Sequence, residues 1–151
     1  MQLKFKKKLY GVQMHNELQL KVGLWIGEKL NQAYVRGKND CCTLFMEYHD
    51  YMHGTETLKS IYNKYTNKTG AIRTARKFKI TEEWLPKQGY KQVDTPADGD
   101  IVILDTELYP SGYIVCNNLA WTNVDGKFRM QRYPLTAPTS PYSIWRHHTH
   151  E

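Results

Sequence analysis

Features that mark membrane, secreted and repetitive proteins are missing from this chain of 151 residues. No stretch approaches the roughly 20 consecutive apolar residues that a membrane-spanning helix needs. The N-terminus is basic, but no apolar segment of the kind found in secretory signal peptides follows it, so we expect no export by that route. There is no internal repeat, low-complexity tract or linker, which predicts a single domain.

Cysteine is also scarce. Cys41 and Cys42 are adjacent, and Cys116 is far from them in the sequence. Three cysteines in this arrangement cannot form the even-numbered framework of a secreted disulfide-rich domain. We therefore expect free thiols in a protein made in a reducing cytoplasm.

The composition favours a folded protein, because 40% of the residues are hydrophobic and 13% are aromatic. The net charge is +6, and much of it lies in residues 4–8 and 64–79. Such clusters can contact phosphates, but positive charge on an amphipathic helix is usually its solvated face. Nucleic-acid binding therefore stays a secondary alternative.

Helical patterns fill the first half of the chain. Apolar residues at helical spacing predict a helix over 16–33, namely Leu18, Val22, Trp25, Ile26 and Leu30. Asn39 and Asp40 are typical helix caps, so a second helix should begin at about Cys41 and end at Gly54. Shorter helices are expected over 56–65 and 70–78.

Short strands should fill the second half, over 100–104, 112–117, 119–123, 127–133 and 142–146. The Asp125-Gly126 pair is typical of a hairpin turn between two of them. Helices followed by antiparallel strands predict an α+β protein. We expect one domain over 16–146, a basic N-terminal arm over 1–15 and a C-terminal tail over 147–151.

Two motifs resemble those of the NlpC-type papain-like cysteine hydrolases. The segment 34–44 has a Tyr and a Gly ahead of an Asp-Cys pair that opens a helix, and 97–104 resembles the Gly-Asp-hydrophobic strand that begins the sheet of that superfamily. The segment 144–146 resembles the closing strand of small domains often encoded among phage virion and tail genes. The resemblance implies an NlpC-type fold, with N-terminal helices packed on a C-terminal antiparallel sheet.

In this family the cysteine of the Asp-Cys pair is the nucleophile, which here is Cys41. A helix N-terminus favours the thiolate, because its partial positive charge and unpaired N–H groups lie beside the sulfur. We interpret Asp40 as the helix cap beside the nucleophile rather than as a catalytic group. Cys42 and Cys116 are expected to be small buried residues.

The resemblance places the catalytic histidine where this chain has Pro110. Proline has no acid–base group, so a Cys–His pair cannot form there. His15 precedes the expected first helix, and His49 lies about 12 Å along the helix from Cys41. His53 is farther away, and the terminal histidines reach the thiol only if the tail folds back over it, namely His147, His148 and His150.

His49 and His53 have the i, i+4 spacing of helical zinc sites, but they lack the accompanying Glu and an evident third ligand. We therefore expect neither a metal nor a cofactor, and we assign the terminal histidines no native role.

These observations predict a non-catalytic papain-like domain, a degenerate cysteine hydrolase, that serves in a phage virion, in the tail or head-to-tail region. It would be made in the host cytoplasm and bind other virion proteins through aromatic and basic surfaces, with no membrane span. The first alternative is an active cysteine peptidase or amidase that cuts peptide or peptidoglycan-stem amides with Cys41. The second alternative is a basic nucleic-acid-binding module.

Overall fold

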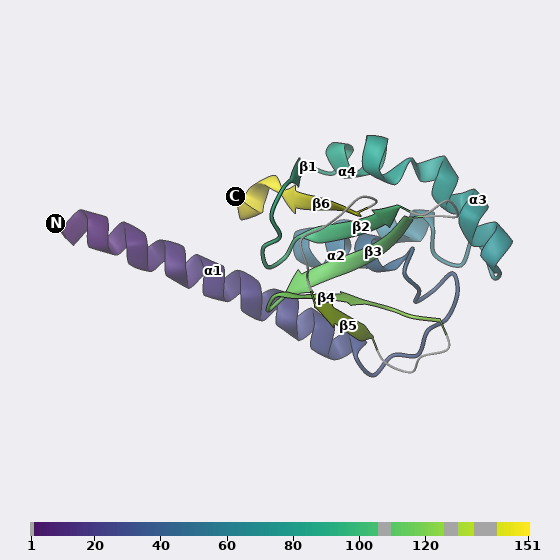
Figure 1. Ribbon diagram of the computed structural model, residues 1–151, viewed down its shortest axis with the longest axis horizontal. Coiled ribbons are helices and arrows are strands. Elements are labelled where there is room, and N and C mark those ends of the chain that lie inside the picture. Colours follow the sequence, from purple (N-terminus) through teal and green to yellow (C-terminus); the bar gives the residue numbers. More distant parts are fainter. Residues whose placement is uncertain (1, 106–109, 126–129, 135–141) are drawn as a thin grey trace.

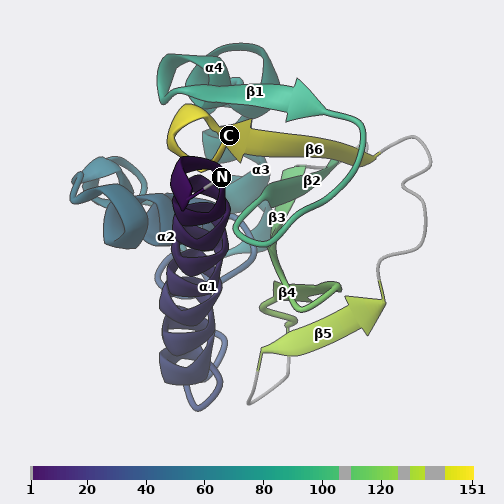
Figure 2. The ribbon, with the colours of Figure 1, turned by 90° about the vertical axis from the view of Figure 1, so that its left-hand side faces the viewer.

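The computed structural model describes residues 2–105, 110–125, 130–134 and 142–151. Within these ranges the side chains described are those of 16–104, 111–125, 130, 132 and 142–151. Helices occupy the first half of the chain and an antiparallel sheet the second, which confirms the α+β class. Figure 2 shows helices α1 and α2 together on one side of the sheet.

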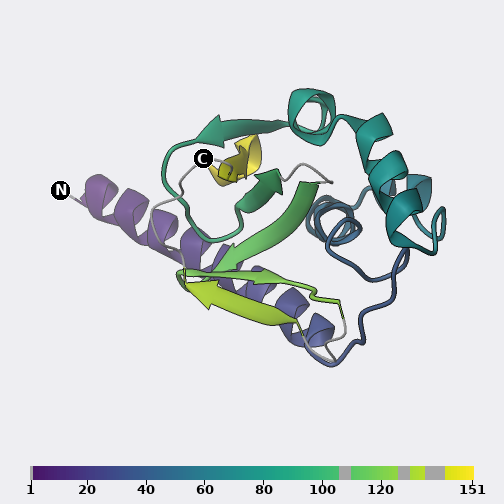
Figure 3. The same ribbon diagram turned by 45° about the vertical axis from the view of Figure 1, so that its right-hand side comes forward.

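Helix α1 runs from Gln2 to Lys29. The predicted apolar stripe is correct, because Val22, Trp25 and Ile26 are buried. The predicted start at residue 16 is wrong, since the helix includes nearly all of the expected basic arm. That segment is rich in Leu, Lys and Gln, which favour helix strongly enough to tolerate Gly11. Figures 1 and 3 show the N-terminal half of α1 projecting beyond the sheet.

Helix α2, Leu44–His53, packs along strand β3. It begins three residues after the predicted start at Cys41, because residues 41–43 form a turn ahead of it. It ends where Gly54 adopts a left-handed conformation with φ of 68°. A short 3-10 helix, Thr57–Ser60, follows where a helix was expected over 56–65. Helix α3, Lys68–Phe78, begins where the Asn67 side chain accepts a hydrogen bond from the Gly70 N–H.

Three elements between the halves were not predicted. A π-helical turn, Ile80–Trp84, leads into the single turn α4, Leu85–Lys87, and then into strand β1, Tyr90–Val93. Strand β1 pairs with β6 alone, so it forms one edge of the sheet.

The sheet has six antiparallel strands in the order β1-β6-β2-β3-β4-β5. The remaining strands are β2 (Ile101–Asp105), β3 (Pro110–Cys116), β4 (Leu119–Thr122), β5 (Gln131–Pro134) and β6 (Tyr142–His147). Strands β2, β3, β4 and β6 begin and end within a few residues of their predicted bounds. Of the expected strand over 127–133, residues 127–129 lie outside the described residues, and β5 ends one residue beyond the predicted end. The expected hairpin turn at Asp125-Gly126 continues outside the described residues. Asn117 and Asn118, both with positive φ, form the tight turn between β3 and β4.

The main core lies between α2 and the sheet. Ile101, Ile103 and Ile114 are fully buried on the face that meets the helices. Gly112 lets β3 approach α2 closely, because a Cβ at this position would lie 2.7 Å from Cδ1 of Phe45. The start of α2 is therefore held directly against the sheet.

Candidate functional site

Asp40 organises the turn that precedes α2. Its Oδ1 accepts hydrogen bonds from the N–H groups of Cys42 (2.9 Å) and Thr43 (2.8 Å). Its Oδ2 accepts from the Gly37 N–H and from the Tyr65 hydroxyl, both at 2.7 Å. The Thr43 hydroxyl accepts in return from the Asp40 N–H, as in a capping box. This buried carboxylate thus satisfies four donors.

Cys41 is the first residue of that turn and is partly exposed. The Ser111 hydroxyl, on β3, donates a weak hydrogen bond to its sulfur over 3.7 Å. The Gly112 N–H donates to the Cys41 carbonyl over 3.0 Å, which fastens β3 to the helix start. A serine hydroxyl can orient a thiol, but it cannot take up a proton near neutral pH as an imidazole does.

Cys42 is buried against the core. A hydrogen bond to the Cys41 side chain, together with burial and the nearby charge of Asp40, raises the pKa of its thiol far above the ordinary value. Cys42 therefore stays protonated. Cys116 is also buried, and burial raises the pKa of its thiol.

Pro110 begins β3 and pairs with Asp105 of β2. This is the position at which the resemblance expects the catalytic histidine, one residue before Ser111. His15 lies inside α1 rather than ahead of it. The other five histidines gather at the far end of α2, about 12 Å or more along the helix from Cys41.

The C-terminal tail does fold back, but onto this far end of α2 rather than over the thiol. The His53 ring stacks on that of His147, with 3.8 Å between ring centroids, and lies 5.7 Å from that of His150. The expected tail over 147–151 therefore packs on α2, and its first residue, His147, is the last residue of β6. The residues after it form a 3-10 helix, His148–His150.

Within the part of the chain that the structure describes, no group of three His, Cys, Asp or Glu side chains is arranged to hold a metal ion. The electrostatics agree, because the nearest charges to His53 and His150 include the cation Lys21. The described histidines form a cluster of packed aromatic rings.

The Asp of the second motif has a structural role. Asp100 is fully buried and accepts two hydrogen bonds from the Arg146 guanidinium, at 2.8 and 3.0 Å. Burial raises the pKa of this carboxyl, and Arg146 opposes that effect. The neighbouring Gly99 carbonyl accepts from the Tyr48 hydroxyl at 2.7 Å, which ties α2 to the start of β2.

A buried polar network on the other side of α2 was missed by the sequence analysis. The Lys29 ammonium donates to Asn39 Oδ1 (2.6 Å) and to the Glu47 carboxylate (2.8 Å). Asn123 of the segment after β4 donates to the same Asn39 oxygen at 2.9 Å. The network fixes the end of α1, the loop before Cys41 and the sheet relative to one another.

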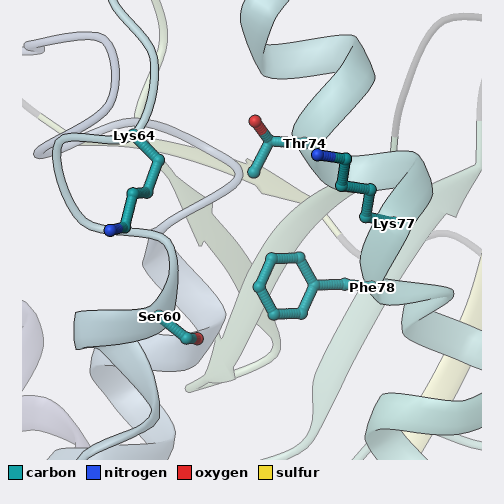
Figure 4. Close-up of a pocket in the computed structure, with 5 residues that line it drawn as sticks. All are labelled: Ser60, Lys64, Thr74, Lys77 and Phe78. Atoms are coloured by element: carbon teal, nitrogen blue, oxygen red, sulfur yellow. The ribbon is translucent and has the colours of Figure 1, made fainter.

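A surface hollow of about 370 Å³ lies between the 3-10 helix Thr57–Ser60 and α3 (Figure 4). It is lined by Ser60, Lys64, Thr74, Lys77 and Phe78. Both lysines are exposed to solvent, so their charges are hydrated and screened by salt. We regard the hollow as part of the solvated basic face of α3.

The geometry defines an α+β domain in which a turn that is held by Asp40 and contains Cys41 leads into a helix packed on an antiparallel sheet. Residues 15–144 match the model of a family described as a domain of unknown function, DUF6950, and the chain belongs to this family. No curated protein and no solved structure matches the chain. Among the described residues, no helix has the length and hydropathy to cross a membrane.

Proposed function

We propose that this chain is a non-catalytic domain of the papain-like, NlpC type, and that it serves as a structural or assembly component of a phage virion, in the tail or head-to-tail region. The observation that carries the proposal is the environment of Cys41. Pro110 stands at the position of the base, and the five described histidines outside α1 lie at the other end of α2. None of these five histidines lies beside the Cys41 thiol, where it could take up the thiol proton and later protonate a leaving amine.

The capping contacts explain why an Asp-Cys motif persists without catalysis. Asp40 joins the loop at Gly37, the turn before α2 and Tyr65 through buried hydrogen bonds. A fold can outlast its chemistry when its residues are needed for stability and its surface has another use.

The shape of α1 supports an assembly role. Its N-terminal half projects beyond the sheet (Figure 1), and along its described part Leu20 and Leu24 are 63% and 57% exposed. Two exposed leucines one helical turn apart form an apolar strip that a second helix can cover. A projecting helix of this kind suits a protein that is built into a larger particle.

The active cysteine hydrolase is the competing function, and the partial exposure of Cys41 at a helix start favours it. The test compares the wild-type protein with Cys41→Ala on peptide and peptidoglycan-stem substrates. We expect no turnover above background from either protein, because losing general acid–base assistance alone costs about 10² to 10⁴ in rate.

Melting curves of both proteins provide the control for folding. Cys41→Ser is the second variant, because it keeps a polar group beside Ser111 while removing the thiol. Turnover by the wild type that disappears in both variants, at unchanged melting temperature, would overturn the non-catalytic assignment.

A further inference from the structure

The histidine cluster joins parts of the chain that are far apart in sequence. His49 and His53 come from α2, His147 from the end of β6 and His150 from the 3-10 helix after it. Ring centroids are 4.8 Å apart for His49 and His53, and 3.8 Å for His53 and His147. Imidazole packing therefore holds the C-terminal segment against α2.

Two ring nitrogens of the cluster are hydrogen-bonded and two others are buried without a hydrogen-bond partner. His147 Nδ1 accepts from the Thr149 N–H at 3.3 Å, so this nitrogen carries a lone pair. His49 Nδ1 is hydrogen-bonded to the Tyr90 hydroxyl at 2.8 Å. His53 Nε2 and His150 Nδ1 are buried and have no hydrogen-bond partner. A proton added to either of these two would create a buried, unpaired charge.

The positive groups around the cluster oppose protonation of His53 and His150, whereas the Asp50 carboxylate favours protonation of His49. The groups that face the cluster are Lys21 from α1, Asp50 from α2, Tyr90 from β1, Arg146 from β6, and His148 and Glu151 from the C-terminal segment. The two carboxylates are already engaged. Asp50 accepts from Thr55, Thr57 and the Leu58 N–H, and Glu151 pairs with Lys91.

Burial and the neighbouring positive groups lower the pKa of His53 to about 3 and that of His150 to about 4. Burial also lowers the pKa of His49 and His147. In an unfolded or detached segment these rings would return toward about 6.5. Because the folded values are lower, the cluster contributes its full stability above about pH 6.5 and loses it as the pH falls toward 4.

We propose that the histidine cluster is an acid-sensitive latch that fastens the C-terminal segment 147–151 and strand β1 to the end of α2. At neutral pH the uncharged rings pack together. On acidification the rings take up protons and repel one another, and the segment detaches. Strand β1 then also detaches from the end of α2, because Tyr90 pairs with His147 and the Gly89 carbonyl accepts a hydrogen bond from the His148 N–H. The central strands β2, β3 and β4 keep their pairing.

Hydrogen exchange of the full chain tests the latch, at pH 7.5 and pH 4.5 and with intrinsic exchange rates taken into account. We expect protection to fall at least tenfold at pH 4.5 in peptides covering 88–93 and 144–151, and to change little in 112–122. The combined variant His53→Phe/His150→Phe keeps the ring shape but cannot titrate, so it should retain protection at pH 4.5. His148→Phe removes one titrating ring beside His147 but leaves the two buried, unpartnered nitrogens of His53 and His150, so it should still lose protection at pH 4.5.

Two results would overturn the latch. One is equal acid-induced loss of protection in the wild type and in His53→Phe/His150→Phe. The other is a rise of several degrees in melting temperature when one equivalent of zinc is added at pH 7, which would show that the cluster is a metal site. An unchanged melting temperature with zinc supports a latch made of neutral rings alone.

Discussion

At the scale of single residues, Asp40 accepts four hydrogen bonds that hold together the candidate site. Its carboxylate is buried and accepts from Gly37, Cys42, Thr43 and Tyr65. The Tyr65 hydroxyl depends on this contact, since burial and the nearby carboxylate raise its pKa well above the ordinary value and keep it a donor. Asp40 thus has a structural role beside Cys41, which agrees with its interpretation as a capping residue.

Replacing Asp40 with alanine should lower the free energy of unfolding by at least about 2 kcal/mol. The variant loses a helix cap and leaves buried donors without an acceptor, each effect being worth about 1–2 kcal/mol. Urea denaturation of Asp40→Ala beside the wild type measures the loss. Asp94→Ala is the matched control, because Asp94 is exposed and should cost less than about 0.5 kcal/mol. Equal stability of the two variants would contradict the structural role of Asp40.

At the scale of elements, strand β6 lies between β1 and β2 and depends on the pair between Asp100 and Arg146. Asp100 is fully buried, whereas the Arg146 side chain is 22% exposed. A buried carboxylate without its partner is strongly destabilising, while an exposed pair contributes little.

Arg146→Gln should therefore lower the free energy of unfolding by about 3 kcal/mol at pH 7. This value lies at the low end of the range for breaking a buried ion pair, because Arg146 is partly solvated. Burial already raises the pKa of Asp100. Removing the guanidinium should raise it further, so the loss should shrink as the pH falls toward 5 and the carboxyl takes up a proton. Thermal melts across this pH range check the trend. Lys91→Gln, which breaks the exposed pair with Glu151, should have little effect, and a loss in Arg146→Gln that is independent of pH would contradict the argument.

The elements also show what the sequence could and could not predict. Helix α2 and strands β2, β3 and β6 were predictable because their apolar periodicity is strong and their ends carry Asp, Gly or Pro. Strand β1 was not, since Tyr90–Val93 has only one buried residue and is held by pairing with β6. Edge strands of this kind depend on tertiary contacts rather than on local propensity.

The same distinction applies to the candidate site. Asp40 and Cys41 form a local motif, so their place at a helix start could be predicted. The i, i+4 spacing of His49 and His53 was visible too, but their partners His147 and His150 come from the other end of the chain. Spacing within one helix carries no information about a segment that packs on it from so far away in sequence.

At the scale of the whole molecule, α1 projects beyond the sheet and is the element through which we propose that the protein assembles. Changing Lys6, Lys7 and Lys8 together to Glu should weaken association with acidic partners, because the projecting half of α1 would change sign. Sedimentation velocity at low and high salt measures association. The matched control is Lys64→Glu/Lys77→Glu/Lys79→Glu, which makes the same change in net charge on α3 and its flanks. Unchanged association of the α1 variant at low salt would count against the prediction.

The position of β6 in the sheet also determines when the sheet can form during synthesis of the chain. Strands β1 and β2 are synthesised well before β6, yet each pairs with it. Until residues 142–147 leave the exit tunnel, the nascent chain carries two strands with unsatisfied edges, which are prone to pair with other chains. The sheet therefore closes late, after translation of nearly all of the described chain, and a chaperone that shields β2 during this interval should raise the yield of native protein.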